Sequence, residues 1–324
     1  MQNLNKFRTV FLGSPDEVVP VLKHLLAHSQ LTEIVGVISQ PARKVGRKKE
    51  LIDPPVAAFS KETGIPTLQF DKISSPEGIR ALKELRPDLC ITAAYGQILS
   101  DEFLSVPTRG TINIHPSRLP LYRGATPVQS SLLNGDASTA VSILFTVRKM
   151  DAGNIIVSQD FDIGKDETHP ELLSRLFKSS ATMLTDVALE KLLDSEFTGT
   201  PQDESKVTHC RKISKRDGFT NFKDSAANLY NKYRALTPWP GVYGYLEKVR
   251  ISFVRLSPTD IESTAAPGFL RFEKKGGKLF VSTSDFDIEI HSIQPAGKKP
   301  LDPSSFWNGF SKKADLPFAE SEHE

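Results

Sequence analysis

The sequence predicts an α/β protein in which a doubly wound, mostly parallel sheet is followed by a smaller, OB-like β-barrel domain. As far as residue 193, apolar strand segments alternate with amphipathic helical segments, which is typical of right-handed βαβ crossovers. Five short strand segments then follow one another without helices between residues 242 and 293. A polar, basic stretch separates the two patterns and is expected to be a linker.

The first pattern predicts a sheet crossed by helices. Its expected strands are Thr9–Leu12, Glu33–Ser39, Pro66–Phe70, Asp88–Ala94, Gly110–His115, Thr139–Val147 and Asn154–Phe161. Its expected helices are Glu17–Ala27, Val56–Thr63, Pro76–Arg86 and Glu171–Leu193. Apolar residues at helical spacing, such as Val18, Val21, Leu22 and Leu25, mark the first helix. Ligands of such sheets bind beyond the C-terminal ends of the strands, so we expect the functional residues there.

The second pattern begins with an expected helix, Ala226–Leu236. The strands expected after it are Val242–Leu246, Arg250–Leu256, Gly268–Glu273, Lys278–Thr283 and Asp287–Ile293. Gly276 and Gly277 indicate a hairpin between the third and fourth of these. Trp239 is expected to fill a structural position between helix and barrel rather than to stack on a base. We therefore expect domains at residues 1–194 and 214–316, a basic linker at 195–213 and an acidic tail at 317–324.

The composition excludes several classes of protein. The chain has 324 residues, of which 39% are hydrophobic and 25% charged, as in ordinary soluble globular proteins and unlike disordered or disulfide-stapled chains. It contains no run of about 18 apolar residues that could span a membrane, and its start lacks a secretory signal. Cys90 and Cys210 are far apart, and no Cys/His cluster has zinc spacing. We expect a cytoplasmic monomer with free thiols and no metal.

The charge is unevenly distributed along the chain. Residues 1–205 hold 22 basic and 25 acidic side chains, whereas residues 206–324 hold 19 and 14. A basic C-terminal part on a nearly neutral front suggests an anionic partner, and a solvated surface of mixed charge is the alternative. Arg43, Lys44, Arg47, Lys48 and Lys49 form a basic stretch that Pro41 and Gly46 predict to be a mobile loop suited to phosphate contacts. Further basic residues in and after the linker are Lys206, Arg211, Lys212, Lys215 and Arg216.

Asn113 and His115 are the first candidates for catalysis. Because side chains alternate along a strand, the two project from one face, and Pro116 places His115 at the end of the strand. A carboxamide donates to a developing oxyanion, and an imidazole moves a proton near neutral pH. The alternative is a hydrogen-bonded core Asn beside a packed His. Asp151 also follows a strand and is placed to orient His115, with an Asx turn before Gly153 as the alternative.

Several motifs together resemble the folate-dependent formyltransferases, over almost the whole chain. The motifs of the catalytic core are NIHPSRLP (113–120), YRGATP (122–127) and MDAG (150–153). The flanking motifs are FLGSPD (11–16), AYGQIL (94–99), KISK (212–215), PWPG (238–241) and QPAGKKPL (294–301). The resemblance implies a doubly wound catalytic domain, an OB-like C-terminal domain and transfer of the formyl group of 10-formyltetrahydrofolate, without a metal.

The resemblance also implies roles for individual residues. Asn113, His115 and Asp151 take the catalytic positions. The positions that bind folate are Ser117, Arg118, Leu119, Pro120, Tyr95 and Gly96. Arg118 stands where Leu is usual, and either binds the glutamate tail of the folate or points to solvent. Within the family, the basic loop and the C-terminal domain indicate methionyl initiator tRNA, formylated on its α-amino group. The residues expected to bind that tRNA are Arg43, Lys44, Arg47, Lys48, Lys49, Lys206, Arg211, Lys212 and Lys215.

Other functions are disfavoured by the sequence. An amino-sugar nucleotide, a glycinamide ribonucleotide or water would serve the same chemistry as acceptor, but none explains the two basic segments. A non-catalytic RNA-binding protein would not need Asn113, His115 and Asp151 together. A nicotinamide dehydrogenase would need more than the single Gly13 after the first strand.

Overall fold

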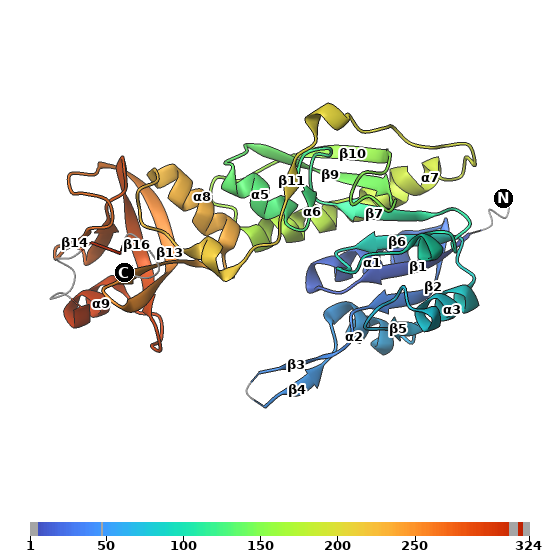
Figure 1. Cartoon of the computed structure of the whole chain (residues 1–324), viewed down its shortest axis with the longest axis horizontal. Coiled ribbons are helices and arrows are strands. Elements are labelled where there is room, and N and C mark those ends of the chain that lie inside the picture. Colours follow the sequence, from blue (N-terminus) through green and yellow to red (C-terminus); the bar gives the residue numbers. More distant parts are fainter. Residues whose placement is uncertain (1–5, 47, 311–316, 320–324) are drawn as a thin grey trace. The chain divides into compact units, whose positions relative to one another are not determined.

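The computed structural model describes residues 6–46, 48–310 and 317–319 of the chain (Figure 1). It divides into two compact units. The first unit is built mainly from residues up to 210, and the second from residues 211 onward with the short segments 128–137 and 164–170. Residues 195–210, which belong to the expected linker, lie in the first unit. No helix in the described ranges is long and apolar enough to cross a bilayer.

A seven-stranded sheet forms the centre of the first unit, in the order β10-β9-β7-β6-β1-β2-β5. The strands are β1 (Phe7–Gly13), β2 (Thr32–Ser39), β5 (Thr67–Gln69), β6 (Leu89–Ala93), β7 (Thr111–His115), β9 (Ser138–Phe145) and β10 (Ile155–Asp162). Five neighbouring strands of this sheet, β7, β6, β1, β2 and β5, pair in parallel. This confirms the predicted doubly wound sheet. The two remaining strands, β9 and β10, run antiparallel at one edge.

Helices connect the strands of this sheet. They are α1 (Val19–His28), which follows a 3-10 turn at Asp16–Val18, α2 (Pro55–Glu62), α3 (Pro76–Leu85) and α4 (Asp101–Leu104). Helix α6 (His169–Met183) follows β10, the last strand of the sheet. The start of α3 shows why the sequence forms a helix there. The Ser75 hydroxyl accepts a hydrogen bond from the Gly78 amide, and Pro76 occupies the first turn. The helix ends at Arg86, whose φ of +48° is left-handed.

The core of the first unit lies on both sides of the sheet, where the strands carry apolar residues without alternation. All five residues of β6 are buried, as the continuous apolar run predicts. A cluster that includes Val10, Ile38 and Leu82 packs α3 and α4 against this centre. The long expected helix after residue 171 is interrupted. From α6 the chain passes through a π-helical turn at Leu184–Ala188 into α7 (Leu189–Lys191).

The second unit contains a five-stranded antiparallel sheet in the order β12-β13-β16-β15-β14. Its elements are α8 (Ala226–Leu236), β12 (Val242–Leu246), β13 (Val249–Glu262), β14 (Leu270–Glu273), β15 (Lys278–Val281), β16 (Phe286–Pro295) and α9 (Pro303–Phe310). Gly276 and Gly277, with φ of +102° and +64°, form the expected turn between β14 and β15. A core around Phe222, Phe253 and Phe306 joins α8 and α9 to the sheet. The sheet is consistent with the predicted OB-like fold.

Two local expectations are wrong. The basic stretch is not an irregular loop, because β3 (Arg43–Val45) and β4 (Glu50–Ile52) pair as a hairpin. Apolar residues flank its basic tip, and Gly46 adopts the positive φ of +71° that the turn requires. Trp239 is 56% exposed and does not fill a buried position.

One further short pairing joins two segments that are far apart in the sequence. A two-stranded parallel sheet of β8 (Arg123–Gly124) and β11 (His209–Cys210) ties the end of the expected linker segment to the first unit. Helix α5 (Pro127–Leu133) follows β8 in the chain.

Candidate active site

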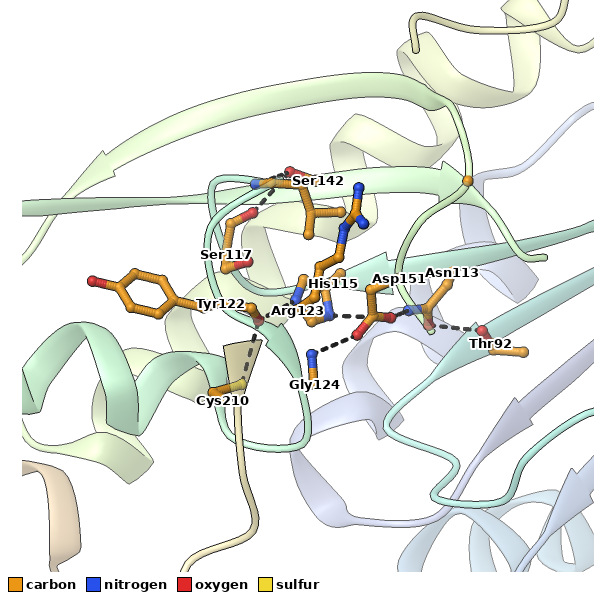
Figure 2. A network of polar contacts seen from close by, with 12 residues as sticks. Thr92, Asn113, His115, Ser117, Tyr122, Arg123, Gly124, Ser142, Asp151 and Cys210 are labelled. Carbon is orange, nitrogen blue, oxygen red and sulfur yellow. Dashed lines mark hydrogen bonds and ion pairs between the residues drawn. The ribbon is translucent and has the colours of Figure 1, made fainter. Parts of the chain in front are cut away.

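The side chains of Asn113, His115 and Asp151 meet at the C-terminal end of β7 (Figure 2). Asn113 and His115 lie two residues apart on β7, and the neighbouring parallel strand β6 also ends there. Asp151 comes from the turn between the antiparallel strands β9 and β10. The structure therefore brings the three sequence-predicted residues together at the expected edge of the sheet.

The amide of Asn113 has a fixed orientation. The hydroxyl of Thr92, opposite it on β6, donates a hydrogen bond of 2.7 Å to Asn113 Oδ1. The Nδ2 group is thereby turned the other way, and it lies 3.5 Å from Asp151 Oδ1. Since the amide oxygen is already occupied, the Asn113 side chain presents a hydrogen-bond donor to this end of the strand.

His115 lies between two acceptors. Its Nε2 is 3.2 Å from the Tyr122 carbonyl oxygen, and its Nδ1 is 3.7 Å from Asp151 Oδ1. A carbonyl oxygen only accepts, so Nε2 carries a proton, which leaves Nδ1 of a neutral ring with a lone pair facing the carboxylate. An imidazolium, protonated on both nitrogens, satisfies both contacts. The ring is buried, with 4% of the residue exposed, which strengthens its interaction with the carboxylate.

Both the backbone conformation and the side-chain contacts of Asp151 are defined by the structure. Its φ is +51°, a left-handed conformation that costs a non-glycine residue about 1 kcal/mol. Its Oδ2 accepts a hydrogen bond of 2.8 Å from the amide of Gly124 in β8, and its side chain is only 12% exposed. The carboxylate therefore accepts from the backbone of β8. This contact differs from the Asx turn before Gly153, which is the alternative that the sequence leaves open.

The residues of the 117–120 segment, which are expected to bind folate, differ in exposure: Ser117 and Leu119 are buried, whereas Arg118 is exposed. Ser117 is fully buried and its hydroxyl donates to the Leu121 carbonyl at 2.8 Å, while Leu119 is buried as well. These two hold the 117–121 segment in shape, and Pro120 follows Leu119 through a cis peptide bond. Arg118 is exposed and forms an ion pair of 3.2 Å with Asp160.

Tyr95 and Gly96 lie after the end of β6. Burial raises the pKa of the Tyr95 phenol, so its hydroxyl stays protonated. Among the described residues this hydroxyl has no hydrogen-bond partner. The Tyr95 ring packs within the core cluster that also contains Val10 and Ile38. Gly96 is exposed beside it, with a φ of +84°. A role of this pair in binding folate stays a prediction.

A pocket of about 460 Å³ lies in the first unit between residues 118–121 and 205–208. Both Arg118, which is expected to bind folate, and Lys206, which is expected to bind tRNA, line this pocket. Lys206 is exposed and lies 3.1 Å from Asp203. The three residues at the end of β7 do not line this pocket.

The other basic candidates are distributed over both units. Arg43, Lys44, Lys48 and Lys49 are exposed on the β3–β4 hairpin, and Arg47 lies outside the described residues. In the second unit, Lys212 and Lys215 are exposed, whereas Arg211 forms an ion pair with Asp217. This ion pair holds the pKa of Asp217 well below its usual range and fixes the turn at residues 214–218. The guanidinium of Arg211 thus stabilises the turn that contains Asp217.

Sequence reasoning missed the residues that support the site. They are Thr92, Tyr122, Arg123, Gly124 and Gln202. The position of Thr92 opposite Asn113 follows from the β6–β7 register, which no local pattern reveals. Among the residues that the structure describes, Arg123 is the largest fully buried side chain, an unusual place for a guanidinium. In the described part of the chain, no three His, Cys, Asp or Glu residues are grouped so as to hold a metal ion.

The fold combines a mostly parallel sheet with an amide donor, an imidazole and a carboxylate at the C-terminal end of β7. The family comparison agrees with this arrangement. Residues 7–188 match the formyl transferase model, residues 212–311 match the model of the formyl transferase C-terminal domain, and the chain belongs to this family.

Relatives of similar length carry a more specific name. A methionyl-tRNA formyltransferase from Roseiflexus castenholzii is 38% identical over 304 residues, which cover 93% of this chain and 95% of that protein. A methionyl-tRNA formyltransferase from Listeria innocua is 35% identical over 302 residues, with 93% and 95% covered. The fold is shared with an N-formyltransferase from Helicobacter canadensis, solved with folinic acid and dTDP-3-aminofucose. That structure has a TM-score of 0.63 at 16% identity and covers 88% of this chain and 98% of its own.

Proposed function

We propose that this protein transfers the formyl group of 10-formyltetrahydrofolate to the α-amino group of methionyl initiator tRNA, as a monomer in the cytoplasm. The observation that carries the proposal is the convergence of an oriented amide, an imidazole and a carboxylate at the end of β7 in a member of the formyl transferase family. The relatives named methionyl-tRNA formyltransferase, which match nearly the whole chain, favour the tRNA over other acceptors.

In the proposed reaction the neutral amine attacks the formyl carbon, and negative charge develops on the formyl oxygen. Asn113 Nδ2 donates to that oxygen, and the Thr92 hydroxyl holds the amide so that the donor faces it. The imidazolium of His115 supplies a second positive group beside it. Donors that are oriented before the reaction stabilise such an oxyanion by about 3–4 kcal/mol each, because they need no reorganisation.

Asp151 balances the charge of His115. Its Oδ1 faces Nδ1 of the ring, and the Gly124 amide holds its other oxygen. As the tetrahedral adduct collapses, the attacking amine loses a proton, the folate nitrogen gains one and the carbon–nitrogen bond to the folate breaks. His115 and Asp151 are the titratable groups at the site for this proton relay, which typically contributes about 10²–10⁴ in rate.

The first test measures formyl transfer to charged initiator tRNA. Charged elongator methionyl-tRNA and a reaction without tRNA run beside it. We expect transfer to the initiator tRNA and far less to the elongator. Folate turnover without formylation of either tRNA would contradict the proposed acceptor, and a sugar nucleotide would then be tried.

We expect the basic hairpin to bind the tRNA. Replacing Arg43, Lys44, Lys48 and Lys49 by Ala should raise KM for the tRNA, leave KM for the folate unchanged, and flatten the dependence of tRNA affinity on salt. Each lost phosphate contact should lower the slope of log Kd against log salt by about 0.7–0.9, since fewer counterions are released. The sequence predicts the same effect for Arg47→Ala.

The matched control for the hairpin is Lys72→Ala, which removes an exposed lysine from the same unit. It should leave both KM values and the salt slope unchanged. Equal effects of the hairpin variant on the two substrates would remove the hairpin from the tRNA surface.

A further inference from the structure

Gln202 connects the segment after α7 with the turn that carries Asp151. Arg123, which is fully buried, donates from Nε and Nη2 to Gln202 Oε1 at 3.0 Å and 2.8 Å. Two donors from one guanidinium fix which end of the Gln202 amide is the oxygen. The Nε2 group of Gln202 is therefore directed away from Arg123.

That Nε2 group uses both of its hydrogens on the turn. It donates to the carbonyl oxygen of Asp151 at 2.8 Å and to that of Gly153 at 2.7 Å. The turn is confined on another side as well, since a Cβ on Gly153 would lie 1.8 Å from the Phe145 carbonyl oxygen. Asp151 keeps its left-handed backbone between these contacts.

We propose that Gln202 is the positioning residue of Asp151, with Arg123 fixing the orientation of its amide. By clamping the two carbonyl groups, Gln202 sets the direction in which the Asp151 side chain leaves the turn, and so the approach of Oδ1 to His115. This inference rests on the proposed function, because it presupposes that Asp151 acts on His115 in catalysis. The segment expected to be a linker then completes the active site.

The same segment offers a control that separates positioning from stability. Glu204 accepts from Arg123 Nη2 at 2.7 Å and from Lys149 Nζ at 2.8 Å. Hydrogen bonds from Arg123 and Lys149 lower the pKa of Glu204 to about 2, so its carboxylate is ionised in any ordinary assay. Glu204 thus contacts the same guanidinium as Gln202, but its contacts do not include the carbonyl groups of the Asp151 turn.

The test compares Gln202→Glu with Glu204→Gln in steady-state formyl transfer. Gln202→Glu keeps an acceptor for Arg123 but removes both donors to the turn. We expect kcat to fall about ten- to a hundredfold, as the loss of two hydrogen bonds implies, with both KM values within about twofold of wild type. Glu204→Gln should keep kcat. Gln202→Met, which has a similar length and no donors, should reproduce the loss if Gln202→Glu fails to fold.

Asp151→Asn is measured in parallel to separate the two hypotheses. If Asp151→Asn loses activity while both folded Gln202 variants keep it, positioning by Gln202 is refuted and the proposed function stands. If Asp151→Asn itself keeps full activity, the proposed role of Asp151 fails first. Equal losses of kcat and of thermal stability in Gln202→Glu and Glu204→Gln would also overturn the inference, since they would assign Gln202 a structural role only.

Discussion

Asn113→Ala is expected to lower kcat by about 10²–10³-fold, with the fold and the KM for tRNA retained. The substitution removes the donor that the Thr92 hydroxyl orients, and the formyl oxygen then develops its charge without that partner. The effect should appear in kcat because the hydrogen bond becomes strong only as the charge develops. Single-turnover formylation with saturating substrates is the measurement, since it reports the chemical step.

Two further variants make this expectation specific. Gln159→Ala truncates an exposed amide on β10 of the same unit and should leave kcat unchanged. Thr92→Val removes the hydroxyl that holds the Asn113 amide, and we expect an intermediate loss of about tenfold, which Thr92→Ser should restore. Wild-type turnover in Asn113→Ala would exclude Asn113 as the oxyanion donor.

Much of the fold could be predicted because it is encoded locally. The continuous apolar run at residues 88–94 predicts a strand buried on both faces, and β6 is buried throughout. The glycine pair at 276–277 predicts the turn between β14 and β15. The direction of β9 and β10 was beyond such reasoning. Their apolar patterns suit either direction. The structure shows that β9 pairs antiparallel with β7 and that β10, which follows after the turn at residues 146–154, pairs antiparallel with β9.

The expectations that failed depend on tertiary context. A basic stretch with Pro41 and Gly46 resembles a loop, yet cross-strand pairs such as Lys44 with Leu51 make it a hairpin. An aromatic residue between prolines suggests burial, but Trp239 is exposed and lies outside the core cluster of the second unit. Composition alone does not distinguish these outcomes.

The candidate site was predictable where strand geometry determines it. Alternation places Asn113 and His115 on one face, and a strand end places Asp151 near them. The supporting contacts span long separations, since Thr92 and Asn113 are 21 positions apart in the sequence and Gln202 and Asp151 are 51 positions apart. A polar segment such as 195–213 carries no signal that one of its amides reaches a distant turn, so only the three-dimensional structure identifies it.

Asp151→Asn is expected to lower kcat by about 10²–10⁴-fold while the site keeps its shape. An asparagine at this position can still accept from the Gly124 amide with its oxygen, which turns its NH₂ group towards His115 Nδ1. That group donates, so Nδ1 must become an acceptor, and the ring is locked as the neutral tautomer with its proton on Nε2. The imidazolium, and with it the positive charge beside the formyl oxygen, is lost.

This variant removes the charge of the carboxylate but keeps the contact from the Gly124 amide, and it also loses the contact from Asn113 Nδ2 to Oδ1, because an NH₂ group takes the place of that oxygen. Asp71→Asn, an exposed substitution of the same type in the same unit, controls for the loss of a carboxylate and should leave kcat unchanged. His115→Ala should cost about as much as Asp151→Asn, and the double variant little more than either, because both act through one imidazolium. Fully additive losses would mean that the two residues work independently, and the pairing seen at 3.7 Å would then be structural rather than catalytic.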